Sequence, residues 1–261
     1  MSTVTLPSGP TLHYTDSGGT GPVLMFSHGF LLDGRMFDAQ VAALSNDYRC
    51  ITWDARGHGD TTYDGAPFTY WDTARDLLAL LDHLGIDRAV LIGMSQGGFA
   101  SLRAALIDPR RIRALVLIDS QGGTEAEEAK PLYEGLAEDW VTKGPNPDVL
   151  PTVATLVLGP NGHDQWVASW LAREQTEIRQ PFRTLMDRDD ITGRLCEIQA
   201  PSLVLHGSED LSIPMERAER MAEALPGADG VVVIQGGAHA SNVTHPEEVN
   251  AAIKDFLANI A

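Results

Sequence analysis

The sequence has few cysteines, few basic residues and no long apolar run, and each shortage excludes a class of protein. Cys50 and Cys196, its two cysteines, cannot form a disulfide framework and lack the paired spacing of a zinc site, so we predict two buried free thiols. Nineteen basic residues against 36 acidic ones give a net charge of −17, which argues against a nucleic-acid or membrane-surface partner. No window approaches the ~20 apolar residues of a membrane helix, and residues 1–7 do not resemble a signal peptide. We therefore predict a soluble cytoplasmic protein.

The 261 residues, 43% of them hydrophobic, are enough to bury a large core. Residues 3–6 and 11–15 alternate around a turn and predict an antiparallel hairpin. Six apolar runs of strand length predict buried strands at 23–26, 50–53, 89–92, 114–118, 202–205 and 231–234. Segments with helical spacing lie among them at 37–44, 71–84, 99–107, 215–225 and 246–257. This alternation predicts an α/β fold with a mostly parallel central sheet covered by helices on both faces.

One region interrupts the alternation of strands and helices. Residues 122–195 contain four helical stretches, at 126–140, 149–158, 164–179 and 181–187, and no convincing strand. We predict that this region is a helical lid inserted into the core, which divides the chain into a first core part (1–121), a lid (122–195) and a second core part (196–261).

The strongest motif is Gly93-Met94-Ser95-Gln96-Gly97, which follows the predicted strand 89–92 and precedes a helix. Small residues two before and two after a serine permit the strained strand-to-helix turn known as a nucleophile elbow, which exposes the hydroxyl at the sheet edge. The helix N-terminus at the same place favours developing negative charge. We predict Ser95 as a nucleophile.

A serine nucleophile needs a base, and the base needs a third group that orients it. Asp210 follows the strand 202–205, and His239 follows the last strand, so both lie at the carboxyl edge of the sheet. Asp119 and Glu209 are alternatives for the acid. Other histidines fit less well: His28 is expected to hold its loop, His206 to be a packing or hydrogen-bonding residue, and His245 to be structural or on the surface.

An oxyanion formed at Ser95 needs two preorganised backbone donors. The residue after the nucleophile, Gln96, provides one N–H. The loop Ser27-His28-Gly29-Phe30 follows an earlier strand, and Phe30 is the expected second donor, with a side chain that would also wall the pocket.

These residues in this order resemble the α/β-hydrolase superfamily over nearly the whole chain. The resemblance includes the Asp54-x-Arg56-Gly57-x-Gly59 turn, the elbow, and the segment Gly237-Ala238-His239. Asp60 stands where serine commonly closes the turn motif. Within the superfamily the chain is most similar to small hydrolases of the 3-oxoadipate enol-lactonase type and to cofactor-free haloperoxidases and perhydrolases.

The resemblance implies an α/β-hydrolase fold and a serine hydrolase that cleaves a carboxylic ester or lactone of a small molecule through an acyl-enzyme. It implies a Ser95-His239-Asp210 triad and needs neither a metal nor an organic cofactor. Perhydrolysis or carbon–carbon bond cleavage by the same triad is an alternative, and a ligand-binding sensor with little turnover is a second one.

Substrate choice is expected to depend on the lid. Trp140, Trp166 and Trp170 are candidates for lining an apolar pocket, or else pack the lid onto the core. A lactone that carries a carboxylate would need a cation, for which Arg173, Arg179 and Arg183 are candidates, although lid arginines more often form surface ion pairs. The sequence leaves ester against lactone, and the oligomeric state, open.

Overall fold

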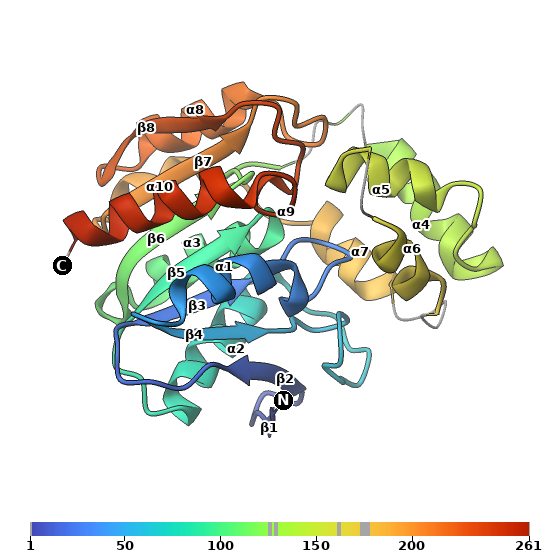
Figure 1. The fold of residues 1–261 in the computed structure, drawn as a ribbon. Coiled ribbons are helices and arrows are strands. Elements are labelled where there is room, and N and C mark those ends of the chain that lie inside the picture. The colour runs from blue at the N-terminus through green and yellow to red at the C-terminus, as the bar shows by residue number, and fades with distance from the viewer. Residues whose placement is uncertain (1, 125–126, 128–129, 161–162, 173–177, 261) are drawn as a thin grey trace.

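A mixed sheet of eight strands forms the centre of the computed structural model, which describes residues 2–124, 127, 130–160, 163–172 and 178–260 (Figure 1). The strands lie in the order β1-β2-β4-β3-β5-β6-β7-β8. Their bounds are β1 (Ser2–Thr5), β2 (Thr11–Asp16), β3 (Val23–Ser27), β4 (Arg49–Trp53), β5 (Ala89–Met94), β6 (Ile112–Ile118), β7 (Ser202–Gly207) and β8 (Ala228–Ile234). The amino-terminal hairpin is antiparallel and joins β4, whereas β4 to β8 run parallel. The predicted hairpin and parallel sheet are confirmed.

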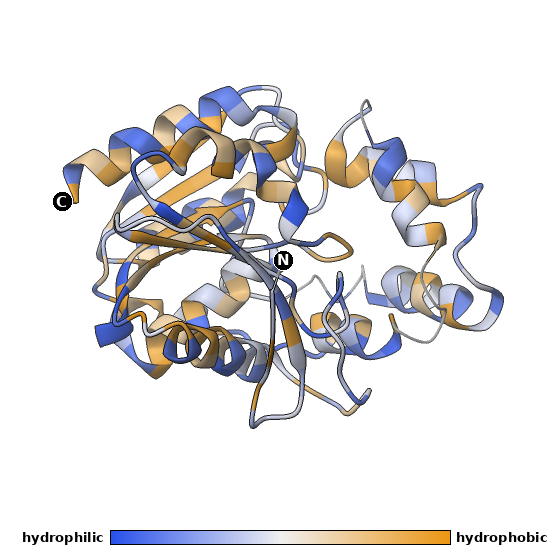
Figure 2. Cartoon of the chain, turned by 60° about the horizontal axis from the view of Figure 1, so that its bottom comes forward, coloured by the Kyte–Doolittle hydropathy of each residue, from blue (hydrophilic) through white to orange (hydrophobic). Residues whose placement is uncertain are grey.

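Helices cover both faces of the sheet, as predicted. On one face α1 (Asp38–Leu44) and α10 (Pro246–Asn259) pack with Leu24 and Phe26 of β3. On the other, α2 (Tyr70–His83), α3 (Gln96–Ile107) and α8 (Met215–Ala224) pack with Met25 and with Leu91 of β5. Neighbouring strand residues therefore serve opposite cores, which is why these strands read as continuous apolar runs. Figure 2 shows hydrophobic colour along the central strands and alternating colour along the surrounding helices.

The last strand differs from its prediction. Residues 231–234 were expected to be fully buried, but β8 lies at the edge of the sheet, where Val232 and Val233 are 42% and 39% exposed. An edge strand has a neighbour on one side only, so an apolar run does not by itself place a strand in the middle of a sheet. The second thiol is also a correction: Cys50 is buried, but Cys196 is exposed in the short 3-10 helix η3 (Thr192–Glu197).

In the described part of the segment between β6 and β7, four α-helices form a group beside the sheet (Figure 1). They are α4 (Lys130–Lys143), α5 (Leu150–Leu158), α6 (Asp164–Leu171) and α7 (Arg179–Met186). Trp170 of α6 fastens this group to the core, because its buried indole N–H donates to the carbonyl of Leu31 at 2.7 Å. The division of the chain at residues 122 and 195 stays a prediction. Within the described residues, every helix is too short or too polar to cross a membrane.

The register of the parallel strands aligns their carboxyl ends. Ser27 pairs with Gly93, Met94 with Ile118, and Ile118 with Leu205. Chain segments that leave these strands therefore emerge at one edge of the sheet, which is where parallel α/β folds place their functional loops.

Candidate active site

Ser95 occupies a sharp turn between β5 and α3. Its backbone angles, φ 49° and ψ −115°, lie in a region that residues with a side chain seldom adopt. The turn is possible because its flanking positions are glycines: a Cβ on Gly97 would overlap the backbone of Ser27, and one on Gly93 would overlap Gly97. The Ser95 N–H donates to the carbonyl of Ile118 at 2.9 Å, which anchors the turn to β6.

Three side chains form a hydrogen-bonded row at the carboxyl edge of the sheet. Nε2 of His239 lies 3.1 Å from the hydroxyl of Ser95, and its Nδ1 lies 2.8 Å from a carboxylate oxygen of Asp210. Ser95 and His239 are 6% and 7% exposed, so the row lies just beneath the surface. The structure thus brings together the three residues that the sequence suggests as nucleophile, base and acid, and it gives them the spacing that proton transfer requires.

The environment of Asp210 favours its ionised form. Burial alone would raise its pKa, but the charge of His239, the hydrogen bond from it and the backbone N–H of Ile213 hold the pKa of Asp210 below its usual value. A second backbone N–H, from Ser212, donates to the same carboxylate oxygen at 2.7 Å. Asp210 can therefore hold the imidazole in the tautomer that carries its proton on Nδ1.

The two alternative acids lie in different environments. Glu209 is exposed. Asp119 is completely buried, and it accepts backbone N–H groups from Gly207 at 2.7 Å and Ser241 at 2.9 Å. Burial, together with the charge of Asp210, raises the pKa of Asp119 to about 7. Asp119 therefore ties together the loops that carry Asp210 and His239.

His206 and His28 form hydrogen bonds with backbone groups of loops. The Nε2–H of His206 donates to the carbonyl of Ile213 at 2.9 Å, which leaves its Nδ1 without a hydrogen-bond partner among the described residues. His28 accepts the N–H of Ala55 and donates to the carbonyl of Gly29. His245 contacts the hydroxyl of its neighbour Thr244 at 3.0 Å.

Of the predicted oxyanion donors, Gln96 directly follows Ser95 and Phe30 lines the same cavity as Ser95. Within the part of the chain that the structure describes, the backbone N–H groups of Phe30 and Gln96 have no acceptor. Leu31, directly after Phe30, has a positive φ of 65°, so the loop holds a strained turn here. Two free N–H groups beside a nucleophile are the arrangement that an oxyanion requires.

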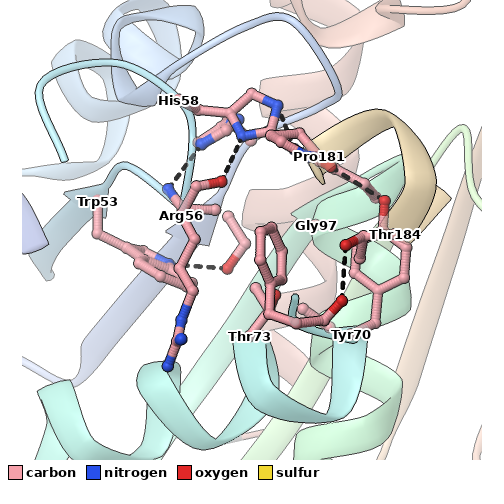
Figure 3. A pocket seen from close by; sticks show the side chains of 14 residues that line it. Trp53, Arg56, His58, Tyr70, Thr73, Gly97, Pro181 and Thr184 are labelled. Carbon is pink, nitrogen blue, oxygen red and sulfur yellow. Dashed lines mark hydrogen bonds between the residues drawn. The ribbon is translucent and has the colours of Figure 1, made fainter. Parts of the chain in front are cut away.

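The side chain of Gln96 lines a small hollow that has room for about one water molecule, together with His58 and Tyr70, which Figure 3 labels. Its carbonyl oxygen accepts the hydroxyl of Tyr70 at 3.1 Å, and its nitrogen lies 3.4 Å from His58. These contacts hold the residue whose backbone N–H is the first expected donor.

A larger cavity of about 400 Å³ lies between the core and the lid, with Ser95 and His239 on its surface. Its lid side presents one face of α4 (Tyr133, Leu136 and Trp140) and one face of α5 (Leu150, Val153 and Val157). The sequence did not identify these residues, apart from Trp140, although their spacing of three and four is that of a helical apolar face. Phe30 also lines the cavity, and its ring packs edge-on against Phe182.

Trp166 and Trp170 are not among the described residues that line this cavity, in contrast to the expectation for them. Both are buried. The indole of Trp170 donates to the carbonyl of Leu31, and the guanidinium carbon of Arg35 lies 5.4 Å above the ring centre of Trp166. They pack the lid onto the core, which is the alternative that the sequence left open.

The described candidate arginines of the lid, Arg179 and Arg183, do not provide a cation at the cavity surface. Arg179 lies 4.0 Å from Glu138, and Arg183 is exposed; neither lines the cavity. Arg173 lies outside the described residues.

Two groups of acidic and histidine side chains are close enough to suggest a metal site, Asp119-His206-Asp210 and His13-Asp54-Asp60. Neither fits a cation well. The Nε2 of His206 carries a proton toward a carbonyl, and both oxygens of Asp54 accept backbone N–H groups, from Gly34 and from Asp60. We therefore assign no metal ligands.

Comparison with known proteins agrees with this geometry. The model of the alpha/beta hydrolase fold family matches residues 22–246. A protein named as the carbamate hydrolase RutD, from Pseudomonas savastanoi pv. phaseolicola, is 28% identical over 249 residues, 90% of this chain and 93% of that protein. A thermophilic esterase from Thermogutta terrifontis has a TM-score of 0.87 and 29% identity, over 99% of this chain and 98% of its own. The enol-lactonase from Burkholderia xenovorans LB400 has a TM-score of 0.88 over 98% and 100% of the two chains and, at 24% identity, supports the fold alone.

Proposed function

This chain belongs to the alpha/beta hydrolase fold family, and from that premise we propose that it is a serine hydrolase that cleaves carboxylic esters through an acyl-enzyme. The observation that carries the proposal is the row of Ser95, His239 and Asp210, which opens onto the cavity beneath the lid. Similarity to a solved esterase supports the same chemistry.

The distances support a role for each group in this proposal. His239 takes the proton of Ser95 through Nε2 as the hydroxyl oxygen attacks the carbonyl carbon, and Asp210 stabilises the imidazolium that results. The N–H groups of Phe30 and Gln96 receive the oxyanion, and one such donor is worth about 3 kcal/mol in comparable sites. The protonated His239 then gives its proton to the leaving alkoxide, which leaves Ser95 acylated. A water molecule, deprotonated by His239, attacks the acyl carbon and releases the acid.

A lactone is opened by the same steps, since its leaving alkoxide stays attached to the acyl group. Perhydrolysis differs only in that hydrogen peroxide replaces water in the second half of the reaction. Product analysis with a short carboxylic acid, with and without peroxide, distinguishes this alternative. Cleavage of a carbon–carbon bond would show as turnover of a diketone without turnover of esters.

The test is hydrolysis of p-nitrophenyl acetate and butyrate by the wild type and by Ser95→Ala. We expect the variant to lose at least about a thousandfold in kcat/KM. The matched control is Ser45→Ala, at the end of α1 and remote from the cavity, which should keep wild-type rates. Wild-type rates in Ser95→Ala would refute the triad. Labelling of Ser95 by a fluorophosphonate without turnover of any ester or lactone would instead favour a ligand-binding sensor.

A further inference from the structure

The cavity that opens on Ser95 is walled by apolar side chains. From the core these are Leu31, Leu32, Met94, Phe99 and Ile213, and from the lid Leu136, Trp140, Leu150, Val153, Val157, Phe182 and Leu185. Its volume of about 400 Å³ lies within the range of small-molecule sites, about 300 to 1,000 Å³. A substrate that fills this cavity must exchange water for hydrocarbon along most of its length.

Charge is nearly absent from the described part of this wall. Besides His239, the charged residues that line it are Asp139 and Lys143, one turn apart on α4, and they neutralise each other across 2.8 Å. Their side chains are 65% and 72% exposed, so the pair lies at the rim and faces water. It offers no unpaired cation to a substrate carboxylate.

One cation behind the described wall, Arg188, is already engaged by other groups. The Arg188 guanidinium lies 4.5 Å from the ring centre of Phe99, and it donates to the backbone carbonyls of Gly123 and Leu185. Arg188 is not among the lining residues, because Phe99 and Leu185 stand between it and the cavity. A carboxylate inside would therefore be desolvated without a partner among the described residues, at a large free-energy cost.

From this wall we infer that the substrate is an uncharged ester whose apolar chain fills the cavity, and that esters with a terminal carboxylate on that chain are excluded. This inference rests on the proposed function. It separates the chain from hydrolases whose substrates carry a free carboxylate, a distinction that the row of Ser95, His239 and Asp210 does not make.

The experiment compares p-nitrophenyl octanoate with the p-nitrophenyl monoester of octanedioic acid, which has the same chain length and ends in a carboxylate. Between butyrate and octanoate we expect kcat/KM to rise about threefold per methylene group, as apolar surface is buried. The carboxylate-ended ester should react at least about a hundredfold more slowly than octanoate. Equal rates for the two, or a preference for the charged ester, would overturn the inference.

A cation placed on the wall should reverse part of the discrimination. Val153→Arg introduces one in the middle of α5, and Val153→Met is the matched control, long but uncharged. We expect the arginine variant to shift the ratio of the two rates at least about tenfold toward the charged ester, and the methionine variant to keep the wild-type preference. If the wild type accepts the charged ester and Arg173→Gln abolishes that activity, a cation outside the described residues forms the true subsite, and the inference is wrong.

Failure of the proposed function gives a different result. In that case p-nitrophenyl acetate is not hydrolysed, or its hydrolysis does not depend on Ser95. The ligand class of the cavity can still be measured, by calorimetric titration of the wild type with octanamide and with the monoamide of octanedioic acid, whose far end is a carboxylate. Tighter binding of octanamide supports the inference, and equal or tighter binding of the anion overturns it.

Discussion

Asp119 should make the stability of this protein fall as the pH rises, which is the reverse of what most carboxylates do. Its carboxyl group is completely buried and lies near the charge of Asp210, and its pKa is raised from 3.8 to about 7. The unprotonated Nδ1 of His206 lies 3.8 Å from one of its oxygens. The lone pair of this Nδ1 repels an ionised carboxylate, so the geometry favours the neutral form of Asp119.

The direction follows from proton binding. Below about pH 4 Asp119 is protonated in both the folded and the unfolded chain, so it does not make the free energy of unfolding depend on pH. Between about pH 4 and pH 7 the unfolded chain loses this proton while the folded protein keeps it, so the free energy of unfolding falls with each pH unit. Above about pH 7 the loss is complete, and it amounts to about 4 kcal/mol for a shift of this size.

The assay compares the wild type with Asp119→Asn, because an amide does not titrate. The substitution also removes one of two N–H acceptors, but that cost is independent of pH. The difference in unfolding free energy, wild type minus variant, should decrease by about 2.5 kcal/mol between about pH 5 and pH 8. Urea unfolding followed by circular dichroism measures it.

The matched control is Asp189→Asn. The pKa of Asp189 is lowered: burial opposes the shift, but the hydrogen bond and charge of Arg103 outweigh it. The contribution of Asp189 to stability is lost only as the pH falls through that lowered pKa. The difference in unfolding free energy between the wild type and Asp189→Asn should therefore stay constant between about pH 5 and pH 8. A flat or rising difference for Asp119→Asn would show that Asp119 is ionised throughout, and the reasoning about its burial would be refuted.

Two further predictions concern the framework of the site. Arg56→Ala should lower the free energy of unfolding by about 3 to 5 kcal/mol, because it leaves the fully buried carboxylate of Asp76 without its ion pair. The control Arg110→Ala breaks an exposed pair and should leave the midpoint of urea unfolding unchanged. Equal effects of the two substitutions would contradict this. Gly97→Ala should lower the melting temperature and abolish esterase activity, because the added Cβ overlaps the backbone of Ser27. Gly135→Ala, on α4 with open space around it, should instead stabilise by about 0.5 to 1 kcal/mol in calorimetry, and a tolerated Gly97→Ala would show that the turn can relax.

The sheet and the row of three side chains were predictable because they depend on short-range patterns. Apart from the edge strand β8, each parallel strand is an apolar run that is largely buried on both faces, and the residues after β5, β7 and β8 must emerge at one edge. Gly93 and Gly97 are required because a Cβ at either position would overlap backbone atoms, so the turn can be recognised from a short stretch of sequence. The assignment of Ser95, Asp210 and His239 to roles in the reaction remains a prediction for the experiments above.

Residues in the lid were harder to assign, because an apolar side chain in a helix has the same pattern whether it faces a cavity or a core. Trp140 lines the cavity, whereas Trp166 and Trp170 are buried against the core, and all three lie in helices of one insertion. The three tryptophans differ in the group that each one contacts; for Trp170 this is the carbonyl of Leu31. That partner is 139 residues away in the chain, so no local pattern could identify it.

Asp119 shows a second limit of sequence reasoning. Its place at the end of β6 made it an alternative to Asp210, since both follow neighbouring parallel strands. The structure gives the two carboxylates different partners: Asp210 meets an imidazole, whereas Asp119 meets the backbone of Gly207 and Ser241. Because these two N–H groups belong to the loops that carry Asp210 and His239, a change at Asp119 should alter the relative position of acid and base. Asp119→Asn should therefore lower kcat more than it raises KM in ester hydrolysis, since Asp119 joins the segments that carry the proposed acid and base, and the cavity wall is formed elsewhere.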